Sequence, residues 1–473
     1  MRPRTSSWIG FAGMCVGTIA VLAPGLAQEK PPPEPAAGPR AAPLPPASTW
    51  KPATAPSPSP GPAPVLVARP PLPPFPPSVP APQEQDVDAL IRQLSAVSAT
   101  ERAMAACELG RMRALDVERA REELLALLTD GTEVEGRLCR DWHNRWNRAR
   151  WDESSPGREA AIALEELGTG VLDPLLDILG GEDAVGREHA AFALGLIESP
   201  RASEPLADAL ERDGTPAVRA RSAWALGMIE SPAAVDALAR AVREDEDPRT
   251  RSQAAWALGM IEDVDGVPAL NVAIEDDDAE VRAQAAWGLG MIEHRDGVAG
   301  LRQAIRDPDA SVRAQAAWAL GMIEHPAAVM PLSEAMEDES AEVRSQAAWG
   351  LGMIEHASAV PALVEGLRDQ DAEVRSQAAW ALGMIESRDG TPGLIEALGD
   401  PDAKVRSQAA WALGMIEDPA AAEALMEALE DEDPKVQEQA MWALGMVMRS
   451  GGFDRVDRRE LAEALRRALA RNP

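Results

Sequence analysis

One stretch, Ser252–Glu262 with the sequence SQAAWALGMIE, recurs almost unchanged through the second half of the chain. Each copy carries a Gln, a Trp three residues later and a Met four residues after the Trp. These three positions share one face of a helix, so amide, indole and thioether groups would lie side by side in every copy. Aromatic and Met side chains give apolar contact and amides give hydrogen bonds, so this face suits an extended polypeptide.

The residues that we expect to bind a partner form three columns along the chain. The Trp column comprises Trp224, Trp256, Trp287, Trp318, Trp349, Trp380 and Trp411 and continues to Trp442; the Met column includes Met260, Met291, Met322, Met353 and Met384; the Gln column includes Gln284, Gln315 and Gln346. If these side chains face water, they mark a binding groove. The alternative is that they fill the space between helices, and the array is then a structural spacer or assembly element.

A helical repeat is needed to position these columns. The Trp positions recur every 31 or 32 residues, and Phe192 continues the same register toward the N-terminus. Each unit reads as a short helix, an acidic turn and a second helix, because apolar residues recur at helical spacing on both sides of the turn. Pro308, Pro401 and Pro434 follow acidic residues and suit the first turn of the second helix.

Units such as DPDASVRAQAAWALGMIE (Asp307–Glu324) resemble the HEAT repeat of the short, bilin-lyase-like bacterial type. The resemblance implies an all-α, right-handed α-solenoid of about ten to eleven helix pairs, with the second helices on the concave side. It also implies that a column of Arg residues pairs with Asp residues along the stack and has a structural role. In this chain that column is Arg219, Arg251, Arg282, Arg313, Arg344, Arg375 and Arg406, with Gln437 in the last unit.

Composition divides the chain into five segments. Residues 1–27 read as a signal peptide, and residues 28–83 as a disordered Pro-rich linker, with 22 prolines between Pro31 and Pro82. Residues 84–181 read as degenerate HEAT-like repeats with an insert at 140–155, and residues 182–448 as regular repeats of 31–32 residues. Residues 449–473 read as a C-terminal capping helix. We therefore expect an exported protein of the periplasm, cell envelope or extracellular space, attached to a membrane only if residues 1–27 stay uncleaved.

The net charge bears on the class of partner, and the cysteine content bears on disulfide formation. The formal net charge is −31, from 46 Lys and Arg against 77 Asp and Glu, which disfavours binding to nucleic acid. Once the signal is removed, Cys107 and Cys139 remain, one repeat apart. We predict a disulfide between them, because disulfides persist outside the cytoplasm.

The sequence contains no constellation typical of catalysis. His294, His325 and His356 end three consecutive second helices, where we expect them to complement the helix dipole rather than bind a metal. The metal-dependent enzymes of the HEAT family use His-Glu dyads, and this chain has no such dyad but only reversed pairs such as Glu188–His189. We expect neither a cofactor nor a metal, and a lyase-type or metal-dependent enzyme stays a remote alternative.

These observations favour a non-enzymatic protein-interaction scaffold. We expect the partner to be a protein or an extended peptide, held along a concave surface of Trp, Met and Gln. The segment Pro31–Pro82 of the same chain is one candidate for that peptide, because proline stacks on aromatic side chains.

Overall fold

The computed structural model describes residues 87–135, 153–450, 459, 462–463 and 466–467. All of them belong to one compact unit, residues 80–473. The predicted signal peptide and Pro-rich linker lie outside the described residues, as do most of the insert and of the C-terminal capping helix. Within the described part of the chain, no helix is both long enough and apolar enough to cross a membrane.

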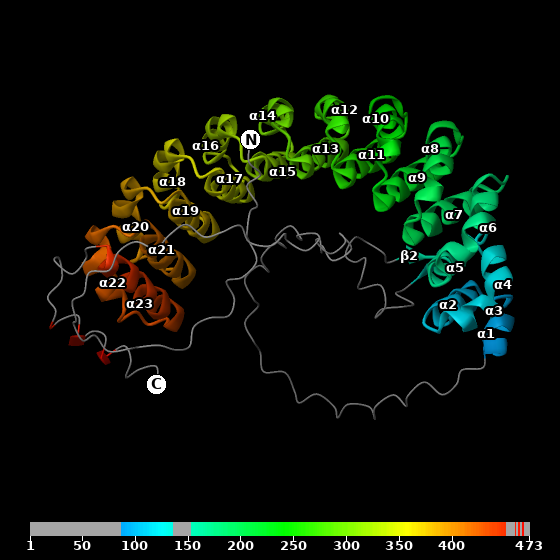
Figure 1. Ribbon diagram of the computed structural model, residues 1–473, viewed down its shortest axis with the longest axis horizontal. Coiled ribbons are helices and arrows are strands. Elements are labelled where there is room, and N and C mark those ends of the chain that lie inside the picture. The colour runs from blue at the N-terminus through cyan, green and yellow to red at the C-terminus, as the bar shows by residue number, and fades with distance from the viewer. Residues whose placement is uncertain (1–86, 136–152, 451–458, 460–461, 464–465, 468–473) are drawn as a thin grey trace, which may run out of the picture. The chain divides into compact units, whose positions relative to one another are not determined.

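The described residues form a solenoid of stacked helix pairs, with a first helix and a longer second helix in most pairs (Figure 1). The N-terminal elements are α1 (Val87–Gln93), α2 (Ala99–Gly110), α3 (Ala114–Arg119), α4 (Arg121–Leu127), β1 (Val134–Glu135), β2 (Glu153–Ser154) and α5 (Pro156–Glu165). The first helices that follow are α6 (Leu172–Leu179), α8 (Ser203–Arg212), α10 (Val235–Glu244), α12 (Val267–Ala273), α14 (Val298–Ala304), α16 (Val329–Ala335), α18 (Val360–Gly366), α20 (Thr391–Ala397) and α22 (Ala422–Ala428). The second helices are α7 (Ala184–Ile197), α9 (Pro216–Ile229), α11 (Pro248–Ile261), α13 (Ala279–Ile292), α15 (Ala310–Met322), α17 (Ala341–Ile354), α19 (Ala372–Ile385), α21 (Ala403–Ile416) and α23 (Pro434–Arg449).

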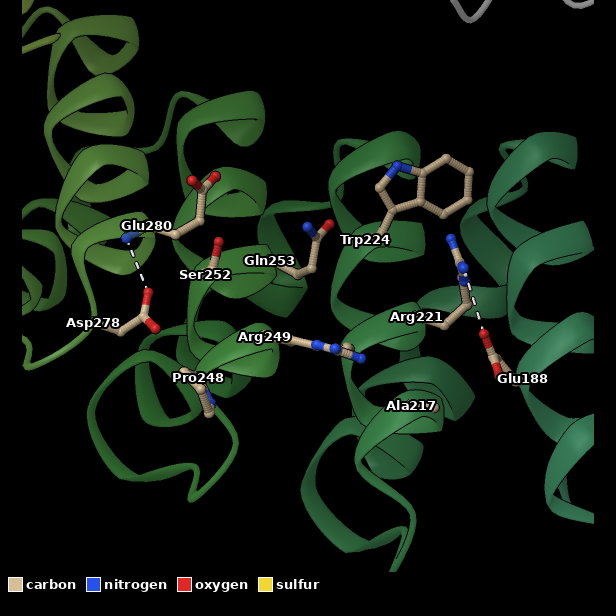
Figure 2. Close-up of a pocket in the computed structure, with 11 residues that line it drawn as sticks. Glu188, Ala217, Arg221, Trp224, Pro248, Arg249, Ser252, Gln253, Asp278 and Glu280 are labelled. Carbon is tan, nitrogen blue, oxygen red and sulfur yellow. Dashed lines mark hydrogen bonds and ion pairs between the residues drawn. The ribbon is translucent and has the colours of Figure 1, made fainter. Parts of the chain in front are cut away.

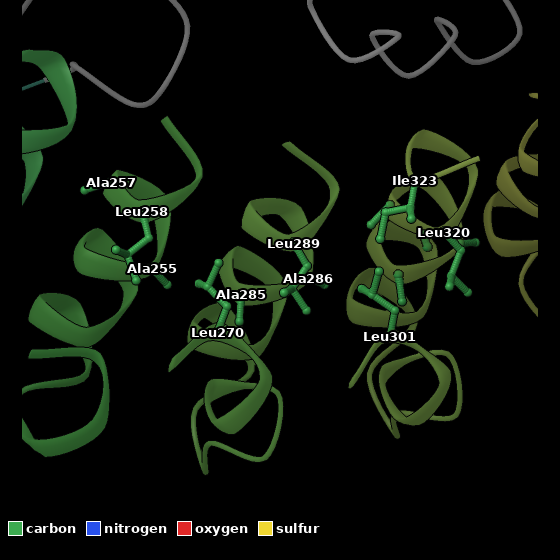
Figure 3. Close-up of a cluster of buried hydrophobic side chains, with 14 of the residues drawn as sticks. Ala255, Ala257, Leu258, Leu270, Ala285, Ala286, Leu289, Leu301, Leu320 and Ile323 are labelled. Atoms are coloured by element: carbon green, nitrogen blue, oxygen red, sulfur yellow. The ribbon is translucent and has the colours of Figure 1, made fainter. Parts of the chain in front are cut away.

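The second helices follow one another along the inner side of a curved row, and the first helices lie outside them (Figure 1). Small residues allow the second helices to pack closely. In α13, Ala285, Ala286 and Leu289 are fully buried, and the equivalent residues of α11 and α15 extend this core from one pair to the next (Figure 3). The core is therefore continuous, and each helix pair depends on its neighbours for burial of its apolar side chains.

The acidic turns set where the second helices begin. In most of these helices the N-cap is an Asp; the Asp278 carboxylate, for example, accepts hydrogen bonds from the N–H groups of Glu280 and Val281. Pro434 is the first residue of α23, as predicted. Pro308 and Pro401 were assigned wrongly, because each lies in the turn before the N-cap Asp309 or Asp402 and outside the helix.

A glutamate in the left-handed conformation follows most of the second helices. These residues, which we call the Glu row, have φ between 49° and 55°: Glu198, Glu230, Glu262, Glu293, Glu324, Glu355, Glu386 and Glu417. Glycine is the usual residue at such a helix end, because a side chain costs about 1–2 kcal/mol in this conformation. The chain therefore accepts repeated backbone strain at one end of its second helices.

The N-terminal repeats depart from the regular pattern. A two-residue antiparallel pairing of β1 with β2 joins the two ends of the segment that contains the predicted insert, and the described fold is otherwise the predicted all-α solenoid. The neighbouring His189 is buried, with Nδ1 2.7 Å from the Leu128 carbonyl and Nε2 3.2 Å from the Ser155 hydroxyl. Burial lowers the pKa of His189, and its neutral ring holds α7 against the preceding repeat.

Candidate functional site

The solvent-facing surface of each second helix is a single stripe. In α13, Glu280 is exposed and Ala283, Gln284, Trp287 and Met291 are half-buried, whereas the residues between them are mostly buried. The spacing of three or four residues keeps these five positions on one side of the helix. The second helices lie on the inner side of the row (Figure 1), and we call the partly exposed Gln, Trp and Met residues that recur at these positions the inner strip.

The predicted Trp residues are partly buried in the helix stack and partly exposed to solvent. Seven of them, from Trp224 to Trp411, are half-buried, and Trp442 in α23 is 38% exposed. The Met and Gln residues predicted to bind a partner are half-buried as well. Each of these side chains thus keeps part of its surface exposed to solvent.

The buried edge of each Trp packs on a glycine of the preceding repeat. A Cβ atom on Gly290 would lie 2.8 Å from Cζ3 of Trp318, and a Cβ on Gly259 would lie 2.7 Å from Cζ3 of Trp287. Only a residue without a side chain fits at these points, because real Cβ atoms do not approach so closely. The same contact recurs at every step from Gly195 with Trp224 to Gly414 with Trp442.

The Trp rings also approach one another along the strip. The rings of Trp256 and Trp287 are stacked, with centroids 6.4 Å apart and planes 11° from parallel. Phe192, which stands one repeat before Trp224, lies 5.2 Å from it at 39°. Aromatic contacts of this kind add about 0.5–1.5 kcal/mol beyond burial and fix the ring orientations.

A hollow of about 480 Å3 opens near the N-terminal end of the inner strip, between α9, α11 and the start of α13 (Figure 2). Trp224, Gln253 and Glu280 line it, together with two arginines. One of them, Arg221, stands where later repeats carry Gln, a substitution that the sequence shows but that our prediction overlooked. The other, Arg249, is exposed at the start of α11.

Arg221 is held between aromatic rings and a carboxylate. Its guanidinium carbon lies 5.0 Å from the Phe192 ring centroid and 5.8 Å from that of Trp224, and Nη2 lies 3.4 Å from Oε1 of Glu188. Burial lowers the pKa of Arg221, although the charge of Glu188 and its hydrogen bond with Arg221 act in the opposite direction. Burial and the charge of Arg221 also lower the pKa of Arg158 to about 9.

The predicted Arg column forms a ladder of ion pairs on the turns that precede the second helices. In one rung, Arg282 donates from Nε and Nη2 to the two carboxylate oxygens of Asp307 at 2.7 and 3.0 Å. Its Nη1 donates to the Asp276 carbonyl at 2.8 Å, so one guanidinium joins two consecutive turns. The equivalent pairs are Arg219–Asp245, Arg251–Asp276, Arg313–Asp338, Arg344–Asp369, Arg375–Asp400 and Arg406–Asp431.

The pKa values of the ladder groups reflect this pairing. Burial alone would raise the pKa of Asp276, but hydrogen bonds from Arg251 and from the Asp278 N–H lower it overall. The hydrogen bond to Asp276 in turn raises the pKa of Arg251. Gln437, in the last unit, donates to the Asp431 carbonyl of its own turn. This is the same bond that each ladder Arg makes to its own turn, without the ion pair to the next repeat.

The pKa shifts found in the Glu row have the opposite sign to those of the ladder Asp residues. Partial burial raises the pKa of Glu293, and the neighbouring carboxylates of Glu324 and Glu262 raise it further. The pKa values of Glu262 and Glu324 are raised for the same two reasons. Glu262, Glu293 and Glu324 are therefore members of the Glu row that neighbouring carboxylates destabilise in the ionised form. Our sequence interpretation missed the Glu row, although most repeats visibly carry a Glu where a helix-ending Gly is usual.

The three successive histidines do not complement the preceding helix ends, and that expectation was wrong. Each lies one residue beyond the Glu row and caps the short 3-10 turn that follows. His325 Nδ1 accepts a hydrogen bond from the Ala327 N–H at 3.2 Å, and His356 accepts one from Ser358 at the same distance. A neutral ring nitrogen is required for this, so the role is structural. Among the described residues, no group of three or more His, Cys, Asp and Glu could hold a metal ion.

Cys107 is buried and disulfide-bonded. Cys15 and Cys139 both lie outside the described residues, so the assignment of Cys139 as the partner stays a prediction. The rest of the insert, Arg140–Ser155, is described only from residue 153 onward.

Comparison with known proteins identifies the family. A family model described as HEAT repeats matches residues 203–271, 267–340, 329–400 and 391–473, and the model of the PBS lyase HEAT-like repeat matches residues 186–212. No curated protein sequence matches the chain.

Several solved structures are similar to the chain. Importin beta in an ammonium sulfate condition is 18% identical with a TM-score of 0.53; the match covers 77% of this chain and 56% of that one, and the likeness shows the fold alone. An engineered protein is 22% identical, with a TM-score of 0.41 and coverage of 77% and 99%. The complex of CpcE and CpcF of phycocyanin lyase from Nostoc sp. PCC7120 is 22% identical, with a TM-score of 0.32 and coverage of 50% and 94%.

Consecutive HEAT-repeat matches overlap, and together they run from residue 203 to residue 473, which is more than half of the chain. They are in register with the helix pairs of the solenoid. The chain therefore belongs to the HEAT-repeat family.

Proposed function

We propose that this protein is a non-enzymatic scaffold that binds an extended polypeptide along the inner strip. HEAT-repeat scaffolds generally bind proteins, and the inner side of this one presents the partly exposed Gln, Trp and Met residues of the inner strip. The single observation that supports the proposal most directly is the partial exposure of the Trp and Met columns over eight successive second helices. A band of partly exposed indole and thioether groups is unusual on a protein without a partner.

The Trp–Gly contacts make the strip suited to binding. One edge of each ring is fixed against the preceding repeat, so little rotamer freedom is lost when a ligand covers the other edge. Identical rungs also give many weak contacts in series, and their combined affinity exceeds that of any one rung.

We also propose that the protein is exported and acts in the periplasm, cell envelope or extracellular space. The support for this is the charged and apolar pattern of residues 1–27. The idea that Pro31–Pro82 of the same chain is a ligand stays a prediction, because that segment lies outside the described residues.

One observation favours the alternative of a structural spacer or assembly element. Each Trp does fill space between consecutive second helices, as its contact with a glycine shows, and packing alone would account for that edge of the ring. The remote alternative, a lyase-type or metal-dependent enzyme, has no catalytic constellation to support it in the described residues. Metal at stoichiometric level in the purified protein would favour it.

Binding can be tested with three peptides of equal length that repeat Ala-Pro-Gln, Ala-Pro-Lys or Ala-Pro-Glu. The readouts are the anisotropy of a labelled peptide and the change in intrinsic Trp emission. We expect at least one peptide to bind and to lose about tenfold in affinity when Met291, Met322 and Met353 are all changed to Ser. The control is Met330→Ser, because Met330 is exposed on the first helix α16.

Binding that survives the triple change, or the absence of binding by all three peptides, would contradict the proposal. In the second case, Trp emission that resists soluble quenchers would support the spacer alternative.

A further inference from the structure

The three columns of the inner strip cannot by themselves fix where a ligand binds. Gln, Trp and Met repeat almost without change from α11 to α21, so a ligand that contacted only these columns would fit equally well in any register. The position seven residues before each Trp from Trp256 onward does vary, and its side chain is exposed in all of these repeats except at the half-buried Glu373. This variable column comprises Arg249, Glu280, Ser311, Glu342, Glu373, Lys404 and Lys435.

The variable column lies beside the inner strip. Arg249 and Glu280 line the same hollow as Trp224 and Gln253 (Figure 2). Farther along, Gln284 donates to Oε1 of Glu280 at 2.9 Å.

The same relation recurs later in the strip. Gln377 donates to Oε1 of Glu373 at 3.1 Å, and Glu373 pairs with Lys404 of the next repeat. The variable column and the Gln column are therefore adjacent, and neighbouring rungs of the variable column can reach one another.

The charges on this surface are not uniform along the row. From α13 to α19 the variable column carries three carboxylates and no base, whereas Arg249 precedes this stretch and Lys404 and Lys435 follow it. No Lys or Arg occurs at any of the five stripe positions of α13, α15, α17 and α19.

The Glu row adds carboxylates at the other end of the same helices, two residues beyond each Met, and the row from Glu262 to Glu386 is exposed. Burial raises the pKa of Glu293, and the neighbouring carboxylates of Glu324 and Glu262 raise it further, which agrees with a surface of like charges at this end of the helices.

We propose that the occupant of the inner strip is a basic extended polypeptide whose Lys or Arg side chains lie over α13 to α19, between the variable column and the Glu row. The proposal rests on the proposed function and names the chemistry of the partner. Carboxylates on both sides attract the cationic groups, and the exposed Trp edges give apolar contact to the methylene stems of the Lys or Arg side chains. Arg249 and Lys435 repel bases at the two ends and so hold the ligand in one register, whereas Lys404 is paired with Glu373.

The test compares the Ala-Pro-Lys, Ala-Pro-Gln and Ala-Pro-Glu peptides on two charge-matched variants. In the first, Glu280→Lys, Glu342→Lys and Glu373→Lys reverse the variable column. In the second, Asp236→Lys, Glu423→Lys and Glu427→Lys make the same change in net charge at exposed positions of the first helices α10 and α22.

For the wild type we expect the Lys peptide to bind at least about tenfold more tightly than the Gln peptide, which corresponds to about 1.4 kcal/mol. The first variant should lose this preference and the second should keep it. The preference should also weaken as salt is added, because the contacts are electrostatic.

Two outcomes would overturn the inference while leaving the proposed function intact: equal binding of the Lys and Gln peptides, or equal loss of preference in both variants, which would indicate attraction to net charge alone. If no peptide binds the wild-type protein, the proposed function fails with it. Circular dichroism of both variants verifies that they are folded.

Discussion

Cζ3 of Trp318 lies over Gly290 of the preceding repeat, 2.8 Å from the point where a Cβ atom on that glycine would stand. This relationship explains why the motif pairs a Trp with a Gly in every repeat. The glycine admits the buried edge of the next indole, and the other edge remains at the surface. A packing role and a binding role therefore coexist in one side chain.

We predict that Gly290→Ala destabilises the protein by about 1–2 kcal/mol. A helix gains about 1 kcal/mol when Gly becomes Ala, but the new methyl would also meet the Ala319 backbone at 2.9 Å, and overpacking costs about 1–3 kcal/mol or more. Urea unfolding followed by circular dichroism gives the change in the free energy of unfolding.

The matched control is Gly445→Ala, at the same position of α23, where no described atom lies within 4 Å of the added methyl. We expect this change to be neutral or stabilising. If Gly290→Ala also proved stabilising, the close Trp–Gly contact would be refuted.

The Arg ladder should contribute to stability in proportion to its burial. Arg313→Gln removes the bidentate pair with Asp338. The Asp338 side chain is only 12% exposed, so its carboxylate would be left without a guanidinium partner. The expected loss is about 1–3 kcal/mol, measured by urea unfolding.

Arg306→Gln serves as the control for this experiment. Arg306 pairs with Glu334, but both side chains are more than half exposed, so the loss should be below about 0.5 kcal/mol. Equal losses in the two variants would show that the ladder does not stabilise the stack beyond an ordinary surface pair.

The strained glutamates offer a stabilising substitution. Glu324→Gly relieves a φ of 49° and removes one member of a repelling row, so we expect a gain of about 1 kcal/mol in the free energy of unfolding. Glu427→Gly, inside α22, should instead cost about 1 kcal/mol. Thermal unfolding of both variants distinguishes the two effects, and a lower midpoint for Glu324→Gly would contradict the strain argument.

Stability should pass through a maximum on acidification. The raised pKa values in the Glu row mean that ionisation disfavours the folded state, and this penalty disappears as pH falls from the raised values toward the ordinary Glu pKa of 4.5. The lowered pKa of Asp276 and its equivalents has the opposite sign: their contribution is complete above the ordinary Asp pKa of 3.8 and is lost as pH falls through the lower folded value.

Urea midpoints measured across this pH range check the prediction. They should rise slightly toward about pH 4.5 and then fall steeply below about pH 3.8. Glu293→Gln should flatten the rise without changing the fall, because it removes a member of the Glu row and leaves the ladder intact. A midpoint that falls continuously from neutral pH would show that the Glu row carries no penalty.

The repeat pattern predicted the helix pairs because a 31–32-residue period leaves few other ways to bury so many Ala and Leu residues. The Arg column was equally visible, since its partner Asp recurs at a constant separation. The early repeats were harder to predict. The position of Phe192 gave their register, and the ladder continues there as the pair Arg187–Asp213. The burial of His189 could not be predicted, because it depends on the Leu128 carbonyl and Ser155, which are distant in sequence.

The sequence by itself determined the repeat, the family resemblance and the side chains that share a helix face, because these follow from local periodicity. Only the tertiary structure decided how far Trp256 and Trp287 are exposed, because that depends on how closely the next helix approaches across a glycine. The same holds for the Glu row and the variable column, whose charges become one surface only when consecutive repeats are stacked.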